Sequence, residues 1–108
     1  MKNNVLTLTI KKKWFDMIKS GYKKEEYREI KEYWIKRLHF DIYNTKPFDL
    51  VRFRNGYKPD SPTVIVELKS VRVGKPKTIW VDEWQDKDVY ILELGNIVGG
   101  NSDIAPFN

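Results

Sequence analysis

The stretch TVIVELKSVRV, residues 63–73, decides how the predicted sheet curves. Its apolar residues at positions 64, 66 and 68 share one face of a strand, because side chains alternate between faces. The valines at positions 71 and 73 have the opposite parity. A bulge near Lys69-Ser70 restores the phase, and bulges bend strands as small barrels require. The stretch therefore predicts one long, bent strand.

The segments on either side complete an α+β pattern. Alternating or β-rich stretches predict further strands at 4–10, 25–29, 49–54 and 89–97, and helical spacing predicts helices at 11–20 and 30–38. Gly21 follows the first helix where a left-handed cap is expected. Both helices precede most of the strands, which favours α+β with a small, bent, mostly antiparallel or mixed β-barrel and two N-terminal helices. A doubly wound parallel sheet needs helices later in the chain.

Length and composition restrict the class of protein. The 108 residues allow one domain, predicted over 1–98, with a flexible tail over 99–108. Cysteine is absent, which excludes disulfides and thiolate chemistry. No apolar run is long enough to span a bilayer and the first residues lack a signal-peptide pattern, so we expect a cytoplasmic protein without a membrane partner.

Positive charge is concentrated in the first half of the chain. The net charge is +5, and residues 1–54 carry 14 Lys and Arg against 7 Asp and Glu. Such a balance indicates a polyanionic partner or, alternatively, a solvated cationic face. Lys11, Lys12 and Lys13 stand at a predicted helix start, where they either bind phosphate or project into solvent.

The densest group of functional residue types is GYKKEEYR, residues 21–28. In an extended segment, Glu26 and Arg28 share one face and Tyr27 packs on the other, while Lys23 approaches from the preceding turn. A carboxylate between two cations forms a polar cluster that can read a base edge. The alternative is an exposed set of ion pairs on an edge strand, which contributes about 0–1 kcal/mol.

Aromatic residues supply candidate stacking surfaces for a base. Tyr57, beside Arg54 and Asn55 in a turn, is the first candidate, because bases stack on aromatic rings while cations hold phosphates. Trp14 and Trp34 have helical spacing and are expected in the core. The single histidine, His39, is expected to be a packing or surface residue. The acidic run around Asp82 and Glu83 predicts an exposed loop rather than a metal site, so no metal or cofactor is expected.

The pattern Gly21-x-Lys23-x-x-Glu26-x-Arg28 after an amphipathic helix resembles the signature of the ASCH domain, a branch of the PUA-like β-barrel superfamily. The resemblance covers about residues 4–98. It implies a barrel with a cleft lined by the motif residues, and RNA or nucleotide ligands. Supporting stretches are Leu8-x-Ile10 with Trp14-Phe15-x-x-Ile18, Val51-x-Phe53-Arg54-Asn55-Gly56-Tyr57, and Ile91-x-x-Leu94-Gly95-x-Ile97.

The resemblance leaves the chemistry open. One ASCH branch hydrolyses the acetyl amide of acetylated cytidine through a Thr three positions after the motif Lys, but Glu26 stands there in this chain. The first hypothesis is therefore RNA or nucleotide binding in a basic cleft, with ligand contacts from Lys12, Lys23, Glu26, Arg28, Arg54, Asn55 and Tyr57. The alternatives are an enzyme on the same cleft, a ribonuclease or modified-nucleoside amidohydrolase using Lys23 or Glu26, and a protein-interaction module that uses Trp80 and Trp84.

Overall fold

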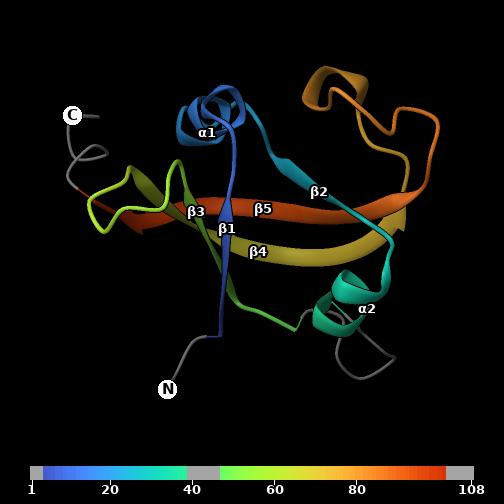
Figure 1. Ribbon diagram of the computed structural model, residues 1–108, viewed down its shortest axis with the longest axis horizontal. Helices are drawn as coiled ribbons and strands as arrows, with labels where there is room; N and C mark the ends of the chain where they lie inside the picture. The colour runs from blue at the N-terminus through green and yellow to red at the C-terminus, as the bar shows by residue number, and fades with distance from the viewer. Residues whose placement is uncertain (1–3, 39–46, 102–108) are drawn as a thin grey trace.

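The computed structural model describes residues 4–38 and 47–101. Within these residues the chain forms five strands and two α-helices, whose arrangement can be followed in Figure 1. The strands are β1 (Val5–Thr9), β2 (Glu25–Glu29), β3 (Leu50–Arg54), β4 (Thr63–Gly74) and β5 (Val89–Gly100). The helices are α1 (Lys12–Lys19), α2 (Glu32–Leu38) and the short 3-10 helix η1 (Thr78–Trp80).

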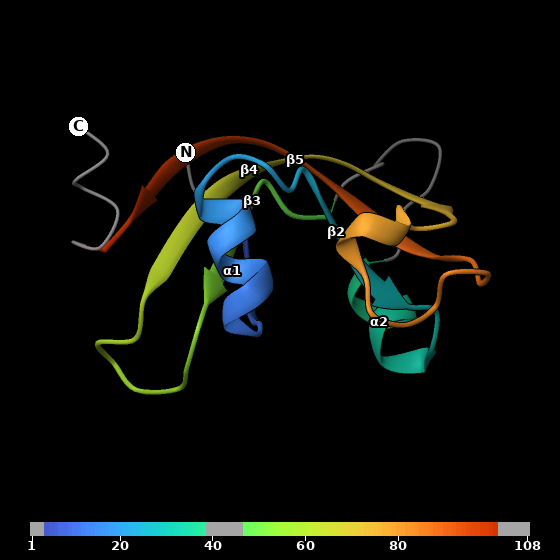
Figure 2. The ribbon, with the colours of Figure 1, turned by 90° about the horizontal axis from the view of Figure 1, so that it is seen from above.

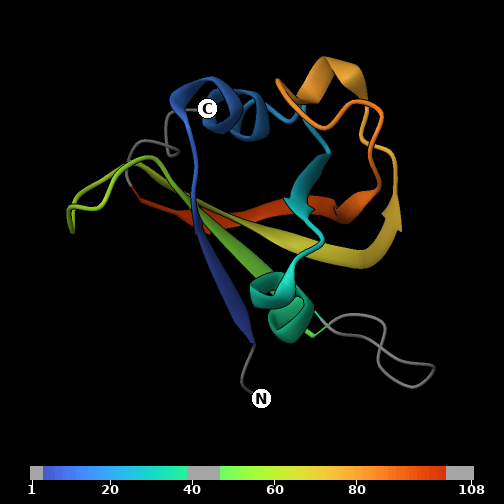
Figure 3. The same ribbon diagram turned by 45° about the vertical axis from the view of Figure 1, so that its right-hand side comes forward.

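The strands form one mixed sheet in the order β1-β3-β4-β5-β2. Among the described strands, the β1–β3 pair is parallel and the other three pairs are antiparallel. The sheet curls into a half-barrel, and both helices lie on its concave side (Figure 2). Because β1 and β2 are the two edges, the sheet stays open between them (Figure 3). The α+β class, the two early helices and the bent, mostly antiparallel sheet are thus confirmed, although the described strands do not close a barrel.

The curvature arises where β4 pairs with β5. The register shifts between Leu68 and Ser70, where the parity change predicted a bulge, and at two further steps between Ile65 and Leu68. Each irregularity bends the strand and strengthens its twist. β5 also runs past its predicted end at residue 97, and Gly100 pairs with Val64. The predicted tail therefore begins inside the sheet, and its residues 102–108 lie outside the described part of the chain.

Two hydrophobic clusters lie on opposite faces of β2 and β5. The larger one fills the concave side and includes Leu92 of β5 and Phe15 of α1. The smaller one contains Tyr27, Trp80, Val89 and Ile91. Alternation along β5 explains this division, because Ile91 and Leu92 must point to opposite faces.

Between β4 and β5, Asp82 and Glu83 are exposed, as predicted for the acidic run, whereas Trp80 of η1 is buried. Trp80 is only 8 % exposed, because its indole packs into the smaller cluster. Trp80 and Trp84 stand in a largely polar stretch without a sustained period, so the sequence pattern did not indicate this burial. Among the described residues, no helix is long and apolar enough to cross a membrane.

Candidate functional site

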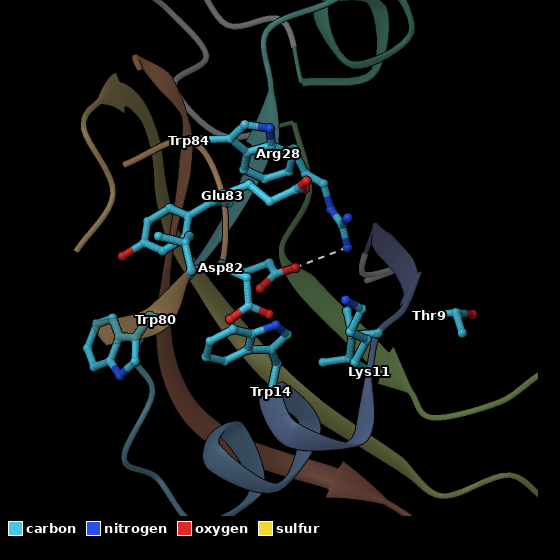
Figure 4. Close-up of a pocket in the computed structure, with 12 residues that line it drawn as sticks. Thr9, Lys11, Trp14, Arg28, Trp80, Asp82, Glu83 and Trp84 are labelled. Atoms are coloured by element: carbon cyan, nitrogen blue, oxygen red, sulfur yellow. Dashed lines mark ion pairs between the residues drawn. The ribbon is translucent and has the colours of Figure 1, made fainter. Parts of the chain in front are cut away.

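A hollow of about 260 Å³ lies between the end of β1, the strand β2, helix α1 and the segment after η1. It occupies the place where the two hydrophobic clusters meet, since Trp14 packs against both of them. Figure 4 shows its lining side chains. They are Thr9, Ile10, Lys11, Trp14, Glu26, Tyr27, Arg28, Trp80, Val81, Asp82, Glu83 and Trp84.

A polar array of three motif residues, Lys23, Glu26 and Arg28, lies at this hollow, and the last two of them line it. The Lys23 Nζ donates to Glu26 Oε1 at 2.8 Å, and the Arg28 guanidinium pairs with Glu26 Oε2 at 3.0 Å. The dashed line in Figure 4 marks the second pair. Alternation along β2 turns Glu26 and Arg28 to one face, and the turn at Gly21, with φ +85°, brings Lys23 back toward them. The predicted cluster is therefore present.

Lys23 lies behind the hollow rather than in its wall. Only 1 % of this residue is exposed, and its ammonium also donates to the main-chain oxygen of Glu25. The ammonium is 5.2 Å from the Tyr27 ring centroid and 5.7 Å from that of Trp14. A buried cation requires such partners, because an unpaired charge in the interior is very unfavourable. Lys23 thus positions Glu26, whereas Glu26 and Arg28 reach the hollow.

The free edge of β2 adds main-chain groups on the same side. The Leu94 N–H donates to Lys24 O at 2.9 Å, and the register pairs Glu26 with Leu92 and Arg28 with Tyr90. Hydrogen-bonded pairs alternate with non-hydrogen-bonded pairs in an antiparallel ladder. The N–H and C=O of Tyr27 therefore point away from β5, toward the open side of the sheet. They give the wall one more donor and one more acceptor.

Three indoles surround the polar array. Trp14 comes from α1, Trp80 from η1 and Trp84 from the following turn, and Figure 4 shows Trp84 near Arg28 and the other two indoles on the far side of Asp82. Trp84 has φ +67°, a left-handed conformation that is uncommon for a bulky residue. Strained residues of this kind concentrate at functional sites. The hollow therefore combines flat aromatic surfaces with hydrogen-bonding groups.

The charges at the rim have both signs. Lys11 and Arg28 supply the cations, while Asp82 and Glu83 add carboxylates beside Glu26. Asp82 pairs with Lys13 at 3.1 Å, whereas no carboxylate of the described residues lies within ion-pair distance of Lys11. Lys11 follows β1 and Arg28 lies on β2, whereas Asp82 and Glu83 follow η1. A polyanion is therefore attracted along one side of the rim only.

The Tyr27 side chain lies on the face of β2 opposite to Glu26 and Arg28 and connects β2 to η1. Its hydroxyl donates to Glu25 Oε1 at 2.6 Å and accepts from the Lys77 N–H at 3.1 Å. Burial and the hydrogen bond to Glu25 raise the pKa of Tyr27 well above its ordinary value. Glu25 also pairs with Arg72 at 2.9 Å. This network fixes η1, and with it Trp80, against the strand that carries Glu26 and Arg28.

Four predicted ligand residues lie away from the array. Lys12 is exposed and pairs with Asp16 at 2.6 Å. Arg54 lies with Arg52 in a separate depression and donates to the main-chain oxygen of Lys58. Asn55 and Tyr57 line a shallow depression that shares Thr9, Ile10 and Lys11 with the hollow.

Sequence reasoning missed several residues of the wall. Trp14 was expected in the core, yet it is half-buried and faces the hollow. Lys11, Trp80 and Trp84 carried no spacing signal that ties them to the motif; their only signal was the residue type. Trp34 does pack against the core, and the Arg28 guanidinium lies 5.3 Å from its ring centroid. His39 lies outside the described residues.

Within residues 4–38 and 47–101, no three His, Asp or Glu side chains gather in a way that could hold a metal ion. Comparison with known proteins adds no assignment, because no family model, no curated protein and no solved structure matches the chain. The chemistry of the hollow is therefore the basis for a functional proposal.

Proposed function

We propose that this chain is an ASCH-type, PUA-like domain that binds a base of RNA or of a free nucleotide in the hollow. The observation that supports this best is the Glu26–Arg28 pair, which presents an acceptor and a donor side by side among three indoles. Carboxylates accept from exocyclic amino groups, guanidinium groups donate to ring carbonyls, and indoles stack on bases.

The size of the hollow favours a single base. Its volume of about 260 Å³ lies just below the range of about 300–1,000 Å³ that drug-sized ligands occupy. The mixed charges of its rim also favour a base, because the Glu83 carboxylate disfavours phosphate beside the indoles, whereas Lys13 balances the charge of Asp82. We therefore assign the base, rather than the phosphate, to the interior of the hollow.

Binding is better supported than the two alternatives. Catalysis by Lys23 needs an ammonium that touches the substrate, and Lys23 is 1 % exposed. Both oxygens of Glu26 accept from cations, which makes this carboxylate a weak candidate for a general base. A partner protein that uses Trp80 and Trp84 would need both indoles on an outer surface, whereas Trp80 is buried and both indoles line the hollow.

To test the proposal, the protein is titrated with the four common nucleosides, their 5′-monophosphates and N4-acetylcytidine. Binding is measured by tryptophan fluorescence and by calorimetry. We expect at least one base to bind and to quench the fluorescence. Trp84→Ala should weaken binding by about 1–3 kcal/mol, and Trp84→Phe should restore most of it.

Lys58→Ala is the control, since Lys58 is exposed and lies outside the hollow. The proposal is wrong if none of these compounds binds, or if Trp84→Ala and Arg28→Ala bind every one of them as the parent protein does.

A further inference from the structure

A second depression adjoins the hollow at the end of β1. The two share the consecutive residues Thr9, Ile10 and Lys11, and the second is completed by Asn55, Gly56 and Tyr57. A ligand longer than one base thus has a path out of the hollow. Its first contact on that path is Lys11.

Tyr57 stands at the far end of this path with 87 % of its surface exposed. The turn that carries it is firmly held: the Asn55 Nδ2 donates to Ile10 O at 2.9 Å, and the Asn55 N–H donates to Pro62 O at 3.0 Å. Gly56 has φ +133°, which other residues rarely adopt, and a Cβ there would lie 2.6 Å from Ser61 Oγ. An aromatic ring is therefore displayed in solvent on a rigid support tied to β1.

The charges select this direction over the opposite one. Among the three lysines at the start of α1, Lys12 pairs with Asp16 and Lys13 with Asp82. The Lys11 ammonium has no carboxylate of the described chain within ion-pair distance, so its charge is left for a phosphate. On the other side of the hollow, Lys13 balances the charge of Asp82, and the Glu83 carboxylate repels phosphate. A nucleic acid strand that leaves the hollow is thus directed past Lys11 toward Tyr57.

From this arrangement we infer that the ligand is a single-stranded nucleic acid of at least two nucleotides. The first base occupies the hollow, Lys11 binds the phosphate that follows, and the next base stacks on Tyr57. The inference rests on the proposed function, since it needs a base in the hollow. It adds a second subsite that distinguishes a strand from a free nucleotide.

The experiment compares each of the four ribonucleoside 5′-monophosphates with the matching RNA and DNA homotrinucleotides, using calorimetry at two salt concentrations. For the preferred base, the trinucleotide should bind at least tenfold more tightly than the monophosphate. Tyr57→Ala should remove about tenfold of the trinucleotide affinity and leave the monophosphate affinity unchanged, and Tyr57→Phe should retain the parent value. Lys11→Gln should make the slope of log K for the trinucleotide against log salt concentration shallower by about 0.7, because one phosphate contact is lost.

Matched controls are Tyr33→Ala, another exposed tyrosine, which lies on α2, and Lys12→Gln, a neighbouring lysine that already has a partner. Both should bind the trinucleotide as the parent does.

Equal affinity for monophosphate and trinucleotide, or a Tyr57→Ala variant with unchanged trinucleotide affinity, overturns the second subsite while the base site stands. Absence of binding by every monophosphate and trinucleotide overturns both. If Tyr57→Ala weakens the binding of the RNA or of the DNA trinucleotide, the second subsite is supported. The trinucleotide that binds more tightly shows whether ribose or deoxyribose is preferred.

Discussion

The lysines at the start of α1 and the lysine before β2 carry the same charge in opposite environments. Lys12 and Lys13 pair with Asp16 and Asp82 in solvent, where more than half of each lysine side chain is exposed. Lys23 pairs with Glu26 at a similar distance but is 1 % exposed. Exposed pairs contribute about 0–1 kcal/mol, whereas breaking a buried pair costs about 3–5 kcal/mol. The contrast shows that burial, rather than the number of ion pairs, decides which carboxylate the fold depends on.

The largest expected effect on stability follows from removing the Glu26 carboxylate, which accepts from both Lys23 and Arg28. Glu26→Ala leaves Lys23 buried without its carboxylate, so the free energy of unfolding should fall by about 3–5 kcal/mol. Urea unfolding followed by circular dichroism measures it. Asp16→Ala is the matched control, because it removes the partner of the exposed Lys12. If Glu26→Ala lowers the free energy of unfolding by less than about 1 kcal/mol, the Lys23–Glu26 ion pair is not buried as described above.

A second prediction extends the comparison to tyrosines and to pH. Burial and Glu25 raise the pKa of Tyr27, so the neutral hydroxyl is favoured in the folded state. The unfolded chain ionises at its ordinary pKa of about 10. This contribution to stability is therefore fully present below about pH 10 and is lost as the pH rises further. Tyr27→Phe should be less stable at pH 8 by about 1–3 kcal/mol, because it leaves hydrogen-bonding groups without a partner.

The pH dependence supplies the check on Tyr27. Between about pH 9.5 and 11, the stability of Tyr27→Phe should decline less steeply than that of the parent, as measured by urea unfolding at each pH. Tyr57→Phe provides the comparison, since Tyr57 is 87 % exposed, and its decline should follow the parent. Identical slopes for all three proteins would contradict the raised pKa of Tyr27.

The smallest expected effect is that of the exposed pair at the helix start. Lys12→Ala removes an i,i+4 contact with Asp16 and should change the free energy of unfolding by no more than about 0.5 kcal/mol. Removing a cation from the start of a helix also offsets part of that loss. The same urea titration in 0.05 and 0.5 M NaCl tests this. A loss above 1 kcal/mol would mean that the two groups of lysines do not differ as described.

Much of the fold follows from local patterns in the sequence. The parity change in residues 63–73 predicted the irregularity at Leu68–Ser70, and alternation over Glu25–Glu29 placed Glu26 and Arg28 on one face. These features depend on neighbours within a few residues. The family resemblance directed attention to the same motif, and it stays a hypothesis in the absence of any matching protein.

The missed features depend on contacts between distant segments. Trp80 lies more than 50 residues from Tyr27 in the sequence, and no periodicity in the 74–88 segment indicates that the two pack together. The same applies to Lys11, whose role depends on which of three adjacent lysines finds a carboxylate. The burial of Lys23 was also unexpected, because lysine is almost never fully buried unless it is paired. The sequence predicted the approach of Lys23 to Glu26, but only the folded arrangement shows that the Lys23 ammonium is enclosed beside the rings of Trp14 and Tyr27.

The two unpaired edges of the sheet also bear on how the protein behaves at high concentration. An exposed edge strand is a template on which another chain can add a strand and start aggregation. β2 has four charged residues out of five, in the order Glu-Glu-Tyr-Arg-Glu, and β1 is only five residues long. Charge and shortness both discourage intermolecular pairing. The open side of the half-barrel can therefore stay accessible to a small ligand without acting as a seed for fibrils.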